Sequence, residues 1–219
     1  MTWARARVSV RIRTRQILMP QKAGEYNHAQ PPNPPMPDRC VALLRGVNLG
    51  GNKKVPMADL KALVEDLGFA DVRTLLNSGN VVFTARSSAV RGAAARIQQG
   101  ILDRLGVSCR VTVLTQAEVG AILDENPLAG LCDNPSRMLV AVFAEPAARA
   151  KAVALMEKEW KPEVLAVATR AAYLWCVNGI AAGQLGFAVD RALKDGVTAR
   201  NLATMTKLRE LASLQPGRR

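Results

Sequence analysis

The chain has 219 residues and a formal net charge of +12, and 49% of its residues are apolar. This composition can form the core of one large domain or two small ones. No apolar run reaches the roughly 18 residues of a transmembrane helix, so we expect no membrane association. The only histidine is His28, so the rest of the chain can form neither a Ser-His-Asp triad nor a histidine-based metal site.

The four cysteines are scattered along the chain, and no two of them form a C-x-x-C pair. This spacing argues against a zinc site and against a disulfide framework. It fits a reducing compartment. We expect no metal and no cofactor. The cysteines are Cys40, Cys109, Cys132 and Cys176.

The first 37 residues differ from the rest of the chain. Residues 1–35 carry five arginines and Lys22 against Glu25 alone, and AQPPNPPMP follows at 29–37. We interpret 1–37 as a disordered basic and proline-rich extension, with Met36 as an alternative natural start. A transit peptide and a basic arm for nucleic acid are the two alternatives.

The next segments predict alternating strands and helices. Strands are expected in the first set at 40–46, 71–77, 80–85 and 109–115, and helices at 57–68, 88–105 and 116–124. Ser78-Gly79 is interpreted as a two-residue hairpin turn. In the second set, strands are expected at 137–145, 163–170 and 171–177, and helices at 146–159, 184–194 and 200–213.

The order of these elements predicts an α+β fold. The first set reads β-α-β-β-α-β, which is the order of a ferredoxin-like (α/β plait) fold. The second set begins in the same way but ends in an extra C-terminal helix. We therefore expect two ferredoxin-like subdomains in tandem. The first with its connecting helix covers 38–124, a linker covers 125–136, and the second covers 137–219.

The most unusual stretch is RGVNLGGNKKVP at 45–56. It fails the Walker A pattern, because Asn52 stands where lysine is required, and its glycines do not fit G-x-G-x-x-G. Its glycines can still bring backbone N–H groups close to an anion, and a helix N-terminus follows. Lys53 and Lys54 add two positive charges.

Topology brings a second segment to this loop. In a plait the first two strands are parallel, so RGVN after the first strand and NSGN at 77–80 should lie close together. The predicted anion site, which we expect to lack a carboxylate, comprises Arg45, Gly46, Asn48, Gly50, Gly51, Lys53, Lys54, Asn77, Ser78 and Asn80. The alternative is structural: Asn and Gly suit tight turns, the lysines are solvated, and Arg45 ties the loop to the hairpin.

Three residues near the C-terminus present a similar choice. Either Thr198 or Asn201 caps the last helix, or Arg200 and Asn201 join the loop site from the second subdomain. The sequence does not decide between these two arrangements.

Two motifs resemble a known family. ALLRGVNLGG with SGNVVF, at 42–83, and TARNLATMTKL, at 198–208, resemble the bacterial family catalogued as domain of unknown function 1697. The resemblance covers about 40–213. It implies two ferredoxin-like subdomains and a cytoplasmic bacterial protein, and it implies no established activity.

The function we expect is binding of an anionic or phosphorylated small molecule, or a nucleotide, by 45–56 and 77–80. The first alternative is a module for nucleic acid or protein interaction, although NVVFTA lacks the aromatics of the usual RNA-binding strand. The second is a small phosphate-handling hydrolase. No catalytic constellation is recognisable, so the catalytic residues, the ligand and the oligomeric state stay undefined.

Overall fold

The computed structural model describes residues 37–51 and 53–214, which all belong to one compact unit. The interpretation of 1–37 as a disordered extension lies outside the described residues, apart from Pro37. His28 and Asn52 also lie outside them.

The first half follows the predicted order of elements. It consists of β1 (Asp38–Leu44), α1 (Met57–Asp66), β2 (Ala70–Thr74), β3 (Asn80–Ala85), α2 (Ser87–Leu105), β4 (Val111–Thr115) and α3 (Gln116–Asp124). A capping box starts α3, because the Thr115 hydroxyl accepts from the Glu118 N–H while the Glu118 carboxylate accepts from the Thr115 N–H.

The second half contains one strand that the sequence did not predict. It consists of a 3₁₀ turn (Ala129–Leu131), β5 (Met138–Phe143), α4 (Pro146–Leu155), β6 (Val164–Val167), β7 (Ala171–Trp175), α5 (Leu185–Leu193), a second 3₁₀ turn (Lys194–Gly196), β8 (Val197–Asn201) and α6 (Leu202–Ser213). The sequence predicted that only helices follow the strand at 171–177. This prediction is wrong, because β8 precedes the last helix and includes two residues, 200 and 201, that were predicted to be part of that helix.

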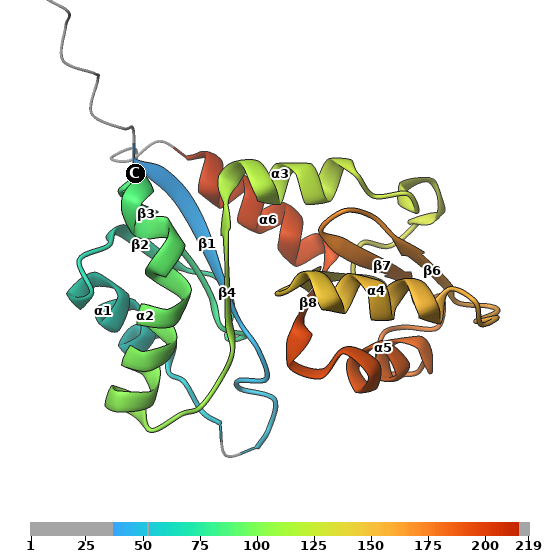
Figure 1. Ribbon diagram of the computed structural model, residues 1–219, viewed down its shortest axis with the longest axis horizontal. Coiled ribbons are helices and arrows are strands. Elements are labelled where there is room, and N and C mark those ends of the chain that lie inside the picture. Colours follow the sequence, from blue (N-terminus) through green and yellow to red (C-terminus); the bar gives the residue numbers. More distant parts are fainter. Residues whose placement is uncertain (1–36, 52, 215–219) are drawn as a thin grey trace, which may run out of the picture. The chain divides into compact units, whose positions relative to one another are not determined.

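The described residues form a mixed α/β fold with two four-stranded antiparallel sheets and six α-helices (Figure 1). The strand orders are β2-β3-β1-β4 and β6-β7-β5-β8. Both β1 and β2 pair antiparallel with β3, so they run parallel to each other and end at the same edge of the sheet. This relation, inferred from the sequence, brings the loop after β1 beside the turn after β2.

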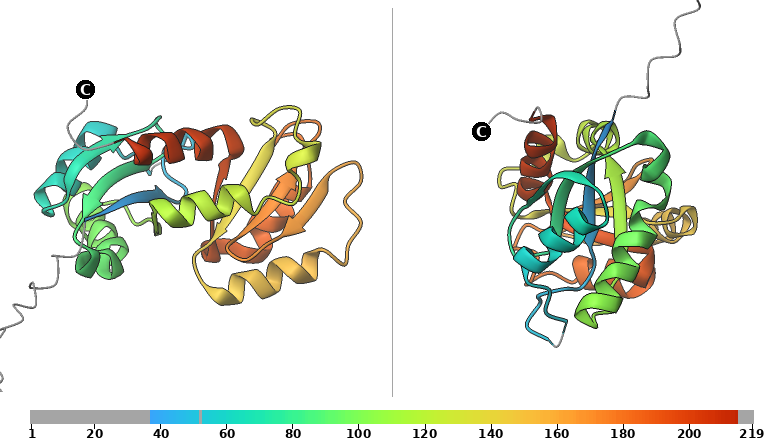
Figure 2. Two further views of the ribbon diagram at one scale, coloured as in Figure 1. Left: turned by 90° about the horizontal axis from the view of Figure 1, so that it is seen from above. Right: turned by 90° about the vertical axis from the view of Figure 1, so that its left-hand side faces the viewer.

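Each sheet has one pair of helices on its outer face (Figures 1 and 2). Apolar side chains of α1 and α2 pack on the first sheet, and those of α4 and α5 pack on the second. The inner faces of both sheets share a third core with α3 and α6. The two halves are therefore joined by continuous apolar packing.

The alternation of side chains along a strand explains how a single strand contributes to two hydrophobic cores. On β7, Ala171, Tyr173 and Trp175 face the shared core, while Ala172 and Leu174 face α4 and α5. Because successive side chains point to opposite faces of a strand, a strand covered on both faces must be apolar throughout.

The turn between β2 and β3 is longer than predicted. Strand β2 ends at Thr74, which pairs with Val81, and the connection runs through 75–79. The two-residue hairpin is therefore wrong. Leu76 and Gly79 both have positive φ, of 57° and 71°, and these two residues reverse the chain within the longer turn.

Candidate functional site

The loop after β1 is closed by the side chain of Asn48. Its Nδ2 donates to Val55 O at 2.9 Å and to Asn77 O at 2.8 Å, and its Oδ1 accepts from Val55 N at 2.8 Å. Asn48 also has a φ of 58°, which asparagine tolerates better than most residues. Both functional groups of this amide are thus engaged within the protein, so Asn48 shapes the loop.

Asn80 has a comparable role inside the hairpin. Its side chain is fully buried, and its Nδ2 donates to Leu75 O and Ser78 Oγ, both at 2.9 Å. The backbone completes the junction, because Leu44 N donates to Gly79 O at 2.8 Å. The structure therefore brings RGVN and NSGN together, and the side chains of Asn48 and Asn80 hold this junction.

Replacing Asn48 with glycine should lower the free energy of unfolding by about 2 kcal/mol. Glycine accepts the positive φ, so the loss isolates three side-chain hydrogen bonds, each with a net value of about 0.5–1.5 kcal/mol. Urea denaturation measures the change. The control is Leu76→Gly, which relieves a positive φ at a residue that is 53% exposed and should be neutral or slightly stabilising. Equal losses in the two variants would contradict the role of Asn48.

Among the described residues, no hydrogen bond or ion pair joins the Arg45 side chain to the hairpin. Its Nη1 donates to Val197 O at 2.8 Å and its Nη2 to Asp190 Oδ1 at 2.7 Å, while Asp195 Oδ1 lies 3.6 Å from Nε. The expectations that Arg45 ties the loop to the hairpin and that the site lacks a carboxylate are both wrong. Two carboxylates from the second half pair with Arg45, and these contacts join the two halves of the chain.

The side chain that does reach the hairpin is Arg200. Its Nε donates to Asn80 Oδ1 at 2.6 Å, and its Nη2 donates to Leu44 O at 2.7 Å and Ser78 O at 2.8 Å. Nη1 donates to Ala199 O at 2.7 Å. No carboxylate pairs with Arg200 among residues 37–51 and 53–214. Burial lowers the pKa of Arg200 to about 10, which leaves the guanidinium protonated at neutral pH.

Thr198 and Asn201 take different positions on β8. Asn201 Oδ1 accepts from Thr204 N at 2.8 Å, so Asn201 caps α6. Thr198 Oγ1 lies 3.2 Å from Thr112 Oγ1 on β4, where it links the two sheets. The sequence left two arrangements open, and each is found for one residue. Asn201 caps α6, and Arg200 reaches the end of β1 and the hairpin from the second half.

The predicted site residues divide between two pockets. The loop pocket, about 460 Å³, is lined by Asn48, Gly50, Gly51, Lys54, Asn77 and the start of α1. The junction pocket, about 450 Å³, includes Arg45, Gly46, Ser78, Thr198, Arg200 and Asn201. Lys53 and Asn80 line neither pocket, since Lys53 is exposed to solvent and Asn80 is buried beneath the hairpin.

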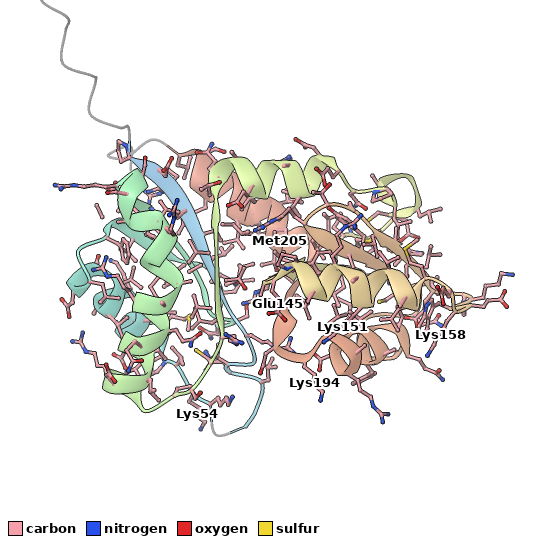
Figure 3. The ribbon with its side chains drawn as sticks, viewed as in Figure 1. Lys54, Glu145, Lys151, Lys158, Lys194 and Met205 are labelled. Carbon is pink, nitrogen blue, oxygen red and sulfur yellow. The ribbon has the colours of Figure 1, made fainter. Side chains whose placement is uncertain are left out.

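Positive groups lie in and beside the loop pocket. No carboxylate pairs with Lys53 or Lys54 in the part of the chain that the structure describes, and both are exposed. Lys54 projects from the loop between β1 and α1 (Figure 3). Helix α1 has Pro56 at its N-cap and no side-chain cap, so its first N–H groups are not bonded to a capping side chain.

Sequence reasoning missed the partners of Arg45 and the walls of the junction pocket. Asp190 lies on α5 and Asp195 follows it, in a segment with no motif. Leu139 and Ile180 also line the junction pocket. Their approach depends on how the two sheets pack, which no local pattern encodes.

The remaining chemistry of the described residues is limited. Burial raises the pKa of Cys40 and of Cys176 to about 12, so both thiols stay protonated at neutral pH. Within the described ranges, no group of three or more Asp, Glu, His or Cys side chains could hold a metal ion. No helix there is both long and apolar enough to cross a membrane.

Comparison with known proteins assigns the chain to a family. The family described as "Protein of unknown function (DUF1697)" matches residues 38–173. The chain belongs to this family, as its motifs suggested. No curated protein matches the chain.

A solved structure of similar fold is that of the conserved bacterial protein SP0830 from Streptococcus pneumoniae. It is 22% identical, with a TM-score of 0.68, and the match covers 81% of this chain and 100% of that chain. At this identity the likeness concerns the fold alone.

Proposed function

We propose that this protein binds an anionic small molecule, such as a phosphorylated metabolite or a nucleotide, in the loop pocket. The observation that carries the proposal is the placement of Lys54 beside Gly50, Gly51 and the uncapped start of α1 in one pocket. Backbone N–H groups, a helix dipole and an unpaired ammonium group all favour negative charge. Each charge-assisted contact can contribute about 1.5–3 kcal/mol.

The setting of this pocket is a pair of ferredoxin-like subdomains in a cytoplasmic bacterial protein. The strand orders and pairing of the two sheets support the subdomains, with 38–124 and 137–219 as their extents and 125–136 as the linker. The resemblance of both sequence motifs to a bacterial family supports a bacterial origin of the protein.

Nucleic-acid binding on a sheet face is less well supported. In the RNA-binding version of this fold, bases stack on exposed aromatic residues of the sheet. Phe83, the aromatic residue of β3, is fully buried under α1 and α2. The opposite face of the first sheet is covered by the core shared with α3 and α6. An anion in the loop pocket therefore fits the described residues better.

A thermal-shift panel on the full chain tests the proposal, with phosphate, nucleotides, sugar phosphates, coenzyme A and a short RNA as probes. A ligand at about 100 times its Kd adds about 2.7 kcal/mol of stability, which raises the Tm visibly. We expect at least one phosphorylated compound to stabilise the protein. The Lys53→Ala/Lys54→Ala variant should lose this shift.

The matched control is Lys151→Ala/Lys158→Ala, which removes the same charge from exposed positions on and after α4 (Figure 3). It should keep the shift if the loop is the site. Equal loss in both double variants would point to general electrostatic attraction, and strong salt dependence with RNA alone would favour nucleic-acid binding. No shift with any compound would count against the proposal.

A further inference from the structure

The junction pocket is distinct from the loop pocket in position and in lining. It lies where the end of β1 and the β2–β3 turn meet β5 and β8, and its volume is about 450 Å³. That size is in the usual range for small-molecule sites. Apolar atoms supply most of its exposed wall, and its lining includes the apolar residues Val47, Leu49, Leu139 and Ile180.

The charge balance of the wall is positive. Arg45, Asp190 and Arg200 are its ionisable residues. Arg45 pairs with Asp190 at 2.7 Å, and Asp195, which does not line the pocket, lies 3.6 Å from Arg45 Nε. Arg200 is different, because its contacts among the described residues are backbone carbonyls and the Asn80 amide, so its positive charge is not compensated. A desolvated charge without a counter-ion favours an anion that can reach it.

Arg200 and Asn201 can both donate to such an anion. Nη1 of Arg200 carries two hydrogens and has one acceptor among the described residues, Ala199 O. Asn201 lines the same pocket, and its Nδ2 has no acceptor there, since only its Oδ1 is used to cap α6. A guanidinium N–H and an amide N–H can bond the two oxygens of one carboxylate.

We propose that the junction pocket binds a small monocarboxylic acid with an apolar body. The carboxylate lies against Arg200 and Asn201, and the apolar part lies along Leu139, Ile180 and Val47. The proposal does not depend on the loop site, because the two pockets share none of these residues. A carboxylate is preferred to a phosphate because Arg200 is the one lining cation without a counter-ion among the described residues, which matches the single negative charge of a monocarboxylate.

The test is calorimetric titration of the full chain with 3-phenylpropionate and 4-methylpentanoate. The neutral amide of each acid and inorganic phosphate serve as comparison ligands. We expect at least one acid to bind, and its amide to bind at least tenfold more weakly because it lacks the charge for Arg200. Absence of binding by both acids would overturn the proposal, as would phosphate binding that displaces them.

The informative variant is Asn201→Asp. Aspartate still caps α6, so the fold is kept, but it replaces the free amide donor with a negative charge. Binding of the acid should fall at least tenfold. The matched control is Asn134→Asp, since Asn134 also caps a turn through Oδ1 to Ser136 N at 3.0 Å but lies outside the pocket. Binding by this control should stay within twofold of the parent.

A second variant keeps the test decisive. Ile180→Trp fills the pocket with apolar bulk without touching Arg200 or the cap of α6, and it too should abolish binding. Unchanged affinity in both Asn201→Asp and Ile180→Trp would overturn the proposal. Loss of acid binding in Lys53→Ala/Lys54→Ala, with retention in Asn201→Asp, would place the acid in the loop pocket instead.

Discussion

Replacing Arg200 with methionine is expected to lower the free energy of unfolding by about 3 kcal/mol. The guanidinium serves Asn80 Oδ1 and the carbonyls of Leu44, Ser78 and Ala199. Its removal leaves several of these acceptors without a donor, and each buried unsatisfied group costs about 1–3 kcal/mol. The loss is smaller than the sum, because the variant also avoids the burial of a charge. Urea denaturation monitored by circular dichroism measures it.

The control for this change is Arg209→Met on α6. Arg209 forms an exposed pair with Asp124 at 3.1 Å, and such pairs contribute about 0–1 kcal/mol. The two variants remove the same charge and add the same side chain. Similar losses would show that the hydrogen bonds of Arg200 contribute little and would contradict its role in joining the hairpin to β8.

The second large effect is expected for Gly79→Ala. A Cβ at this position would lie 2.7 Å from both Leu44 Cβ and Val47 Cγ2, and the φ of 71° is itself unfavourable for alanine. The left-handed conformation costs about 1–2 kcal/mol, and forcing buried neighbours apart adds about 1–3 kcal/mol. We expect a total loss of about 3 kcal/mol, together with a weaker junction between β1 and the turn.

Gly50→Ala separates the two contributions. Gly50 also has a positive φ, of 84°, but a Cβ there would meet nothing within 4 Å. This variant should lose only the conformational part, about 1–2 kcal/mol. If Gly79→Ala were no more destabilising than Gly50→Ala, the close approach to Leu44 and Val47 would have no energetic consequence.

Local sequence patterns predicted most of the first half. A short apolar run placed β1, and alternation placed β4. Helical spacing placed α1 and α2, and the parallel relation of β1 and β2 brought Asn48 beside the turn at 77–80. These features depend on periodicity and on chain order, which the sequence displays directly. The family assignment rested on one motif from this region and a second at 198–208.

The parts that were missed depend on contacts between distant segments. Strand β8 reads VTARN, and its polar residues resemble the start of a helix more than a strand. It is a strand because Val197 and Thr198 pair with Phe143 and Val142 of β5. The pairing of Arg45 with Asp190 likewise joins residues 145 positions apart, and only the packing of the two halves creates it.

The position of α6 has a consequence for synthesis of the chain. This helix, the last described element to leave the ribosome, contacts β1 and β3, which are among the first. Until residues 202–213 emerge, the inner face of the first sheet lacks part of its cover. Val41, Leu43 and Val82 belong to that face and to the core that α6 completes. Part of this apolar surface therefore stays uncovered until residues 202–213 have been synthesised, and such transiently exposed surface favours aggregation during folding.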